Sequence, residues 1–237
     1  MCSGRVDLEF VLRAFSNGTD GVFIGGCRLN ECNFITHGNF HALTMVLLAK
    51  RIMEHIGMNP ERLRIRFMSG ADANLFVESV NSFVQKVKEL GPLGQSEGVA
   101  PEELKARVAQ VTKLVPYIKR VNKDKLATRL NSPDEYDTLF TKDDVDRLFS
   151  GVITYYIDPD KCQACMICAR RCPEDAIMGG KNQIHVIDQE KCIKCETCFD
   201  VCPPRFAAVK RIVGEPVPPP LPADQRMIVK RAKTTTP

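Results

Sequence analysis

The chain has 237 residues, enough for one or two domains, and its 33 basic and 29 acidic residues give a formal net charge of +4. Basic and acidic side chains are interleaved almost everywhere, which argues against a nucleic-acid-binding protein, because phosphate binding uses a continuous basic stripe. No segment has the apolar length of a membrane helix, and neither a signal peptide nor a twin-arginine signal opens the chain. We therefore expect a soluble cytoplasmic protein without a membrane partner.

The first part of the chain, residues 1–94, alternates helical and strand patterns. Short apolar runs predict two strands, the second with Leu63, Ile65 and Phe67 alternating with Arg62, Arg64 and Arg66. Strands that alternate with helices predict an α/β domain whose small parallel sheet is covered by flanking helices. The expected strands are 22–24 and 62–67, and the expected helices are 6–15, 41–56 and 71–90.

Three cysteines of this region, Cys2, Cys27 and Cys32, are expected at one edge of the sheet. Cys27 follows the carboxyl end of a strand, where α/β sheets place their ligands, and Cys32 lies in the same loop. They either share an iron–sulfur cluster or only pack as buried free thiols. Three thiolates do not complete a 2Fe-2S site, so a fourth ligand would come from His37, Asp20, a partner or residues absent here.

Three segments of the first domain carry a family resemblance: Met1 to Phe15, Gly21 to Cys27 with Cys32 five residues later, and Phe83 to Gly91. They resemble the iron–sulfur delta subunit of methyl-viologen-reducing hydrogenase over roughly the first ninety residues. The resemblance implies a subunit that passes electrons from an electron-input module to heterodisulfide reductase. It also implies a 2Fe-2S cluster on the cysteines that match Cys2, Cys27 and Cys32, together with a Cys-rich segment upstream of them.

That upstream segment is missing from this sequence, so the α/β domain is expected to be truncated at its N-terminus. Some relatives carry a selenocysteine codon there. Our hypothesis is therefore that the natural protein begins earlier and that Met1 is an internal methionine downstream of an apparent stop. In-frame DNA that continues upstream toward a Cys-rich strand would support this hypothesis.

Residues 95–151 are predicted to form a charged helical connector. Pro101, followed by two glutamates, is a favourable helix start, because proline suits the first position and acids suit the first turn. Residues 132–134 and 141–144 begin two further helices, the second with a capping-box pattern. No ligand cluster or phosphate loop occurs in this stretch, and we expect it to position the domain that follows.

Residues 152–212 contain the run C-x2-C-x2-C-x3-C-P twice, which is the bacterial spacing for 4Fe-4S clusters. In two-cluster ferredoxins the fourth cysteine of each run binds the other run's cluster. The predicted ligand sets are Cys162, Cys165, Cys168 and Cys202 for one cluster, and Cys192, Cys195, Cys198 and Cys172 for the other. Structural zinc is the alternative, but zinc does not call for a third C-x2 step or for Cys-Pro closure in both copies.

This domain is expected to be an α+β two-cluster ferredoxin in a reducing compartment. Residues 179–187 suggest a hairpin between the two cysteine loops. Ala164, Met166 and Glu196 replace the small glycines common near the second cysteine of each run, which should shield the clusters and change their potentials. The remaining residues, 213–237, are predicted to form a Pro-rich extended tail.

The sequence favours an electron-transfer subunit without substrate chemistry of its own. The resemblance implies a hetero-oligomeric complex that joins a hydrogenase, formate dehydrogenase or NADH-oxidising module to a heterodisulfide-reductase-like flavin and iron–sulfur module, of a kind that can bifurcate electrons. Alternatives are a class II benzoyl-coenzyme A reductase complex, and a stand-alone thiol redox enzyme or sensor fed by the ferredoxin domain. The latter would need an exposed thiol of low pKa with a resolving partner.

Overall fold

A computed structural model describes residues 2–34, 38–130 and 133–228 of the chain. The chain divides into two compact units, Met1–Phe149 and Ser150–Pro237. No helix among the described residues is both long and apolar enough to cross a membrane.

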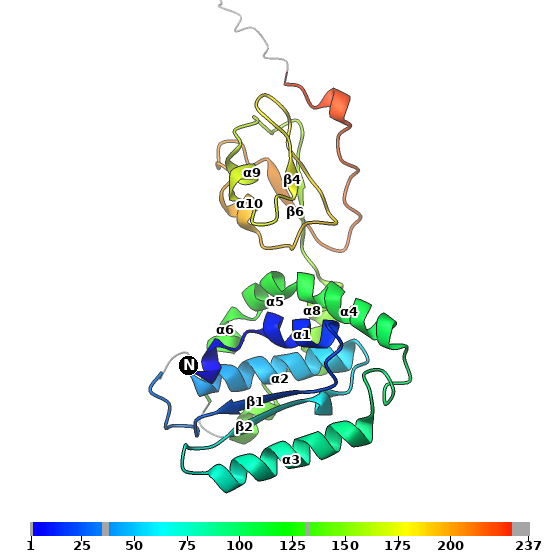
Figure 1. Cartoon of the computed structure of the whole chain (residues 1–237). Helices are drawn as coiled ribbons and strands as arrows, with labels where there is room; N and C mark the ends of the chain where they lie inside the picture. Colours follow the sequence, from blue (N-terminus) through cyan, green and yellow to red (C-terminus); the bar gives the residue numbers. More distant parts are fainter. Residues whose placement is uncertain (1, 35–37, 131–132, 229–237) are drawn as a thin grey trace, which may run out of the picture. The chain divides into compact units, whose positions relative to one another are not determined.

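The first unit is built on a two-stranded parallel sheet. Strand β1 (Val22–Gly26) pairs with β2 (Leu63–Phe67) along its whole length, which confirms the predicted parallel pairing. Helix α2 (Asn39–His55) lies on one side of the sheet and α3 (Ala73–Leu90) on the other (Figure 1). A parallel sheet of this kind needs both faces covered, which the two helices provide.

The core of this unit lies among α2, the first helix α1 (Leu8–Ser16) and the later helix α4 (Pro101–Lys113). Helix α1 begins after Asp7, whose side chain accepts a hydrogen bond from the backbone N–H of Glu9 at 3.0 Å. Its apolar positions recur at helical spacing, and one face is therefore fully buried against α2 and α4. The core residues include Leu8, Val11, Leu12, Phe15, Ala42, Val46, Ala49, Ile52 and Val108.

The region predicted as a connector is helical, as expected. Helices α4, α5 (Val115–Val121), α6 (Lys123–Ala127), α7 (Pro133–Asp137) and α8 (Lys142–Ser150) follow one another. Of these, α4 packs on α1, and α6 and α7 pack on α2. The division of the chain at residues 94 and 151 stays a prediction, as does a positioning role, but these helices pack within the first unit.

Arg62 departs from the strand alternation that the sequence shows. The alternating pattern places it on the solvent side, yet its side chain is 0% exposed and pairs with Glu97 at 2.7 Å. The guanidinium also donates to the backbone carbonyls of Asp20, Leu90, Gly91 and Pro92. Arg62 is buried because the loop after α3 folds back over it and satisfies its donors.

The second unit contains two small antiparallel pairs. Strand β3 (Thr154–Ile157) pairs with β6 (Val209–Ile212), and β4 (Ile177–Met178) pairs with β5 (Val186–Ile187). The second pair is the hairpin that the sequence predicted between the cysteine loops. The helices are the short α9 (Ile167–Arg171) and α10 (Thr197–Asp200), and they pack against each other.

The Pro-rich tail returns to the second unit. Backbone hydrogen bonds join Ile184 N–H to the carbonyl of Arg226 at 2.7 Å and Ile228 N–H to the carbonyl of Asn182 at 2.8 Å. Tail residues, including Val217 and Leu221, line a pocket together with residues of β3 and β5. The described part of the tail is extended, apart from a short turn (Ala223–Gln225), and it lies on its own domain.

Candidate cluster-binding sites

The two cysteine loops of the second unit have the same local structure. Each begins with an aspartate whose carbonyl accepts the N–H of the first cysteine at 3.1 Å: Asp158 for Cys162, and Asp188 for Cys192. Each aspartate N–H in turn donates at 2.8 Å to an alanine carbonyl of the opposite repeat. The repeat in the sequence is therefore also a repeat in hydrogen bonding, and the domain is an internal duplication.

Two residues in each loop adopt a left-handed backbone. Ala164 (φ 49°) corresponds to Lys194 (φ 59°), and Met166 (φ 65°) corresponds to Glu196 (φ 74°). Glycine takes this conformation without penalty, whereas other residues are strained by about 1–2 kcal/mol each. Alternation of left- and right-handed residues turns successive backbone N–H groups toward one concave face, which suits an anionic cluster.

The predicted second ligand set lines one pocket. Cys172, Cys192, Cys195 and Cys198 line one small pocket, together with apolar residues such as Ile177. Burial, followed by the nearby Cys192 and Cys195 thiolates, raises the pKa of Cys198 to about 12. A pocket of four thiols that includes one costly to ionise alone, Cys198, is suited to a metal, because metal binding supplies the positive charge that removes the proton.

The predicted first set also gathers around one buried thiol. Burial, and then the neighbouring Cys162, Cys165 and Cys202, raise the pKa of Cys168 to about 11. Cys202 belongs to the other run, so the crossed arrangement expected of a two-cluster ferredoxin is reflected in which thiols are neighbours. Similarly, burial raises the pKa of Cys192, and Cys172 of the opposite run contributes to this rise.

The donor set fits iron–sulfur clusters. Backbone N–H groups point at sulfur, from Ala176 to Cys172 Sγ at 3.3 Å and from His185 to Cys162 Sγ at 3.5 Å. Such N–H···S contacts are typical second-layer support for a ligating thiolate. Among the residues that the structure describes, no three His, Cys, Asp or Glu side chains are arranged to hold a single metal ion. Each thiolate of a 4Fe-4S cluster binds a different iron, so such a cluster requires no convergence on one ion.

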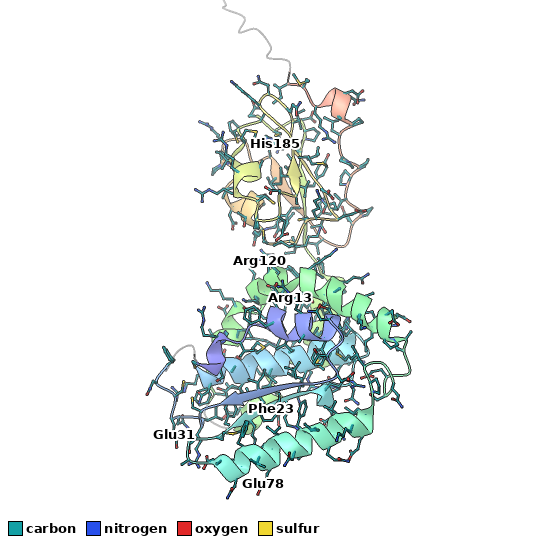
Figure 2. The ribbon with its side chains drawn as sticks, in the orientation of Figure 1. Arg13, Phe23, Glu31, Glu78, Arg120 and His185 are labelled. Carbon is teal, nitrogen blue, oxygen red and sulfur yellow. The ribbon has the colours of Figure 1, made fainter. Side chains whose placement is uncertain are left out.

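His185 is a site residue that the sequence did not reveal. It is 1% exposed, and its Nδ1 lies 3.7 Å from Cys162 Sγ, while Nε2 lies 3.1 Å from Met166 Sδ. Burial lowers the pKa of this imidazole. Figure 2 shows His185 within the second unit. It is brought to the first loop by the β4–β5 hairpin, so no local spacing could have identified it.

The second loop carries charges where the first has none. Lys194 Nζ donates to Gln189 Oε1 at 2.7 Å, and burial lowers the pKa of the ammonium while Cys192 and Cys198 act to raise it. Glu196 has a buried carboxylate that pairs with Arg211. The corresponding residues of the first loop are Ala164 and Met166. The two loops share a backbone but differ in their electrostatic surroundings.

The three N-terminal cysteines lie together, as the sequence predicted for one edge of the sheet. Cys2, Cys27 and Cys32 line one pocket of the first unit, which is open to solvent. Cys2 Sγ and Cys32 Sγ are 3.7 Å apart, and the side chain of Cys2 caps the short helix Ser3–Arg5. The pocket is at the carboxyl ends of β1 and β2, where parallel sheets bind ligands.

Cys32 and Cys27 have different environments in this pocket. Burial alone would raise the pKa of Cys32, but the backbone N–H groups of Phe34 and Asn39 lower it overall. The pKa of Cys27 is raised, by burial and then by Cys32. Asn39 begins the 17-residue helix α2, and its Nδ2 also donates to the Cys27 carbonyl at 2.9 Å. The start of α2 therefore favours a thiolate at Cys32.

Gly38 keeps space for the Cys32 sulfur. A Cβ atom at this position would lie 2.4 Å from Cys32 Sγ and 2.3 Å from the carbonyl oxygen of Phe34. These distances are shorter than real Cβ contacts allow. A side chain at residue 38 would therefore displace the thiol.

Asp20, one of the sources that the sequence offers for a fourth ligand, has its carboxylate engaged away from the three cysteines. Asp20 lies just before the start of β1, where its carboxylate accepts a hydrogen bond from the N–H of Leu93 at 2.7 Å. Cys27 lies just after the opposite end of the same strand. A five-residue strand separates the two positions by about 16 Å, at the usual 3.3 Å per residue. His37 lies outside the described residues. Glu31, labelled in Figure 2, is an oxygen donor that does line the pocket.

Two protein families match separate parts of the chain. The family described as the delta subunit of methyl-viologen-reducing hydrogenase matches residues 1–91, and a 4Fe-4S dicluster domain matches residues 161–206. An iron–sulfur subunit of the F420-non-reducing hydrogenase from Methanococcus maripaludis is 47% identical over 91 residues, which are 38% of this chain and 67% of that protein. The corresponding subunit from Methanopyrus kandleri is 41% identical over 92 residues, covering 39% and 69%.

A second kind of relative contains the same region within a much longer chain. One subunit of the ferredoxin- and F420H2-dependent CoB-CoM heterodisulfide reductase from Methanosarcina acetivorans is 45% identical over 94 residues. The match covers 40% of the present chain and only 12% of that relative. The similarity is therefore to one module of the heterodisulfide reductase subunit.

Proposed function

The chain belongs to the delta-subunit family of methyl-viologen-reducing hydrogenase and carries a 4Fe-4S dicluster domain, and from this we propose that it is an iron–sulfur electron-transfer subunit. The observation that best supports the proposal is the crossed grouping of thiols. Cys172 of the first run lines one pocket with Cys192, Cys195 and Cys198 of the second run, and Cys202 of the second run is among the thiols that act on Cys168. This grouping is the one that two adjacent 4Fe-4S clusters require.

In this proposal the first cluster is bound by Cys162, Cys165, Cys168 and Cys202, and the second by Cys192, Cys195, Cys198 and Cys172. When bound, the clusters accept and release single electrons. The protein's own residues hold the thiolates in place, direct backbone N–H groups at the sulfurs, and exclude water with apolar side chains such as Tyr155 and Ile187. We propose electron transfer alone, and no substrate chemistry, for this domain.

We further propose that Cys2, Cys27 and Cys32 supply three ligands of a 2Fe-2S cluster. The pocket holds all three thiols, and the N–H groups of Phe34 and Asn39 stabilise Cys32 as a thiolate. The fourth ligand comes from a residue outside these three. With this cluster the chain would carry electrons through both of its domains in a reducing, cytoplasmic setting.

The proposed partners are those implied by the relatives. Relatives carry the names of hydrogenase iron–sulfur subunits and of a heterodisulfide reductase subunit. We infer that the chain relays electrons between a hydrogenase, formate dehydrogenase or NADH-oxidising module and a heterodisulfide-reductase-like flavin and iron–sulfur module. A bifurcating complex belongs to this proposal, and a class II benzoyl-coenzyme A reductase complex is the alternative placement.

Affinity purification of the full chain from its native host under anaerobic conditions tests the assignment. An electron-transfer subunit should co-purify with flavoprotein and dehydrogenase or hydrogenase subunits, and its clusters should be reduced when the donor of the partner module is added. A chain that stays alone, and whose clusters are reduced only by small chemical reductants, would contradict the proposal.

A thiol redox function is the second candidate, because Cys2 Sγ and Cys32 Sγ are 3.7 Å apart and the pKa of Cys32 is lowered. A thiol of this kind can attack a disulfide and be resolved by its neighbour. This candidate predicts that mild oxidation of the cluster-free protein joins Cys2 to Cys32 reversibly. Mass spectrometry of alkylated peptides after titration with a glutathione redox buffer would detect that bond.

A further inference from the structure

We propose that Lys194 raises the reduction potential of the cluster held by Cys172, Cys192, Cys195 and Cys198, so that the electron of the half-reduced ferredoxin domain resides on this cluster. The inference rests on the proposed function, since it requires both loops to bind clusters. It states which of the two clusters has the higher reduction potential. Cysteine spacing cannot provide this, because the two runs have identical spacing.

Lys194 has a counterpart at the matched position of the first loop. Lys194 and Ala164 each lie between the first and second cysteine of their loop, and both have a left-handed backbone. Because the loops share one backbone structure, the two side chains emerge from equivalent places. The difference between a lysine and an alanine there is therefore a difference between the surroundings of the two clusters.

The ammonium group of Lys194 is held by a hydrogen bond. Lys194 is partly buried, and its Nζ is held by Gln189 Oε1 at 2.7 Å, while Gln189 Nε2 donates to the carbonyl of Tyr155 at 2.9 Å. The thiolates of Cys192 and Cys198 both interact electrostatically with the ammonium. The positive charge is thus held beside the second ligand set. Because the side chain is partly buried, water screens this charge less than it would screen a fully exposed lysine.

Other charged residues belong to the two cysteine loops. Glu196 is buried in the same loop, but Arg211 pairs with it and offsets its charge. Lys161 and Lys191 precede the first cysteine of their respective loops, and both are exposed, so they affect the two clusters alike. Glu174 lines the pocket of the second ligand set, and Arg170 and Arg171 of the first run have no basic counterpart in the second, but all three side chains are exposed. Lys194 is the partly buried charge in this comparison that has neither a carboxylate partner in the described structure nor a charged counterpart in the other loop.

A cation close to a cluster makes the cluster easier to reduce. Reduction adds one negative charge to a cluster, and a cation nearby stabilises the reduced form more than the oxidised form. The first loop offers the ring of His185 at 3.7 Å from Cys162 Sγ, and a dipole acts over a shorter range than a charge. Cys165 is exposed, and water there also favours reduction, so the proposal holds that the anchored ammonium outweighs this exposure.

The experiment is a redox titration of the full chain, reconstituted anaerobically and followed by low-temperature EPR. The wild type should show two reduction steps. Lys194→Met should move the higher step to a more negative potential and leave the lower step in place. Lys191→Met is the matched control, because it removes the same charge beside the same cysteine from an exposed position, and it should move neither step appreciably.

Two further variants keep the test decisive. Lys194→Arg retains the charge and should keep the higher step close to its wild-type potential. Ala164→Lys places a cation in the other loop and should raise the lower step. If Lys194→Met loses iron, the redox titration is made with Lys194→Gln and Ala164→Lys instead. If Lys194→Met or Lys194→Gln shifts the lower step, or neither step, the inference is wrong. A wild-type chain that binds no 4Fe-4S clusters would instead contradict the proposed function, and iron analysis reveals this before any variant is compared.

Discussion

The ferredoxin loops and the N-terminal pocket gather cysteines by different means. In the ferredoxin domain eight cysteines come from one continuous stretch, and three of them, Cys162, Cys168 and Cys198, belong to the hydrophobic core itself. In the N-terminal unit the three cysteines come from the turn before α1 and the loop after β1, and they line a pocket beside the sheet. Its core consists of aliphatic and aromatic residues of α1, α2 and α4.

Folding and cofactor binding are therefore coupled in the ferredoxin domain and independent in the N-terminal unit. A core that contains buried thiols depends on what those thiols bind, because metal binding is coupled to folding when ligands are part of the core. A core of packed helices has no such dependence. We therefore expect loss of iron to unfold the ferredoxin domain and to leave the N-terminal unit folded.

The largest expected effect is that of Cys198→Ser. The variant should lose the iron of its cluster and the protection of amide hydrogens throughout residues 154–212, because Cys198 is 8% exposed and packs in the core. Cys27→Ser should leave hydrogen exchange unchanged in α1 and α2. Hydrogen exchange followed by mass spectrometry measures both. Equal loss of protection in the two units after either substitution would break the comparison.

A second prediction concerns the stability of the N-terminal unit, which should come from contacts unrelated to cysteine. Glu97→Gln should cost this unit about 3 kcal/mol, because it leaves the fully buried Arg62 without its carboxylate partner. Urea unfolding monitored by hydrogen exchange in α3 measures the change. Glu78→Gln, an exposed position on α3, is the matched control and should cost little.

The same pair gives the unit a defined pH dependence. Burial alone would raise the pKa of Glu97, but Arg62 and the N–H of Asn59 lower it from its usual 4.5 to about 2. A carboxyl whose folded pKa is lowered stabilises the fold above its unfolded pKa, and this contribution is lost as the pH falls from about 4.5 toward 2. The wild type should therefore lose more stability than Glu97→Gln over that interval. Parallel curves for the two proteins would contradict this account.

A third and smaller effect is expected for Gly38→Ala, which tests the N-terminal pocket without removing a thiol. The added methyl group would meet Cys32 Sγ and the Phe34 carbonyl, so the variant should lose any 2Fe-2S signal and should be destabilised by about 1–3 kcal/mol. The control is Gly70→Ala in the wall of the same pocket, where nothing lies within 4 Å of the new atom. EPR spectra and thermal melts of both variants would make the comparison. Equal behaviour of the two would exclude Gly38 as the residue that makes room for Cys32.

The smallest expected effect concerns the reactivity of single thiols in the cluster-free protein. The lowered pKa of Cys32 and the raised pKa of Cys27 predict that iodoacetamide modifies Cys32 first. The rate at Cys32 should reach half its maximum at a lower pH than for an ordinary thiol. Peptide mapping of samples treated between about pH 6 and 10, the range in which thiols ionise, measures which of the two cysteines is modified first. Faster modification of Cys27 would show that the start of α2 does not stabilise the Cys32 thiolate.

The sequence could predict whatever depends on short spacing. The cysteine runs, the hairpin between them and the helical faces of α1 and α2 depend on neighbouring residues, so their patterns are visible in the chain. Arg62 was misplaced because its burial depends on the loop around Glu97, which lies far away in sequence. His185 and Lys194 became recognisable as cluster neighbours only once the hairpin and the duplicated loops placed them beside particular thiols.

The N-terminal pocket lies between these cases. The position of Cys27 after a strand predicted the edge at which the thiols meet, because strand order determines where loops lie. The roles of Gly38 and Asn39 could not be predicted, since neither residue type signals contact with a sulfur atom in a distant part of the loop. Asp20 was only one of several sources considered for a fourth ligand, and the sequence does not show that its carboxylate accepts from the N–H of Leu93 at the other end of β1.

The most direct test of the account is iron and acid-labile sulfide analysis of the anaerobically purified full chain, combined with EPR of the reduced protein. Two 4Fe-4S clusters predict about eight iron and eight sulfide per chain and a spectrum of two interacting clusters, with about two more irons if the N-terminal pocket binds a 2Fe-2S cluster. Cys27→Ser should remove only that last contribution. A chain that contains zinc, no acid-labile sulfide and no EPR signal after reduction would contradict the central claim that it carries electrons.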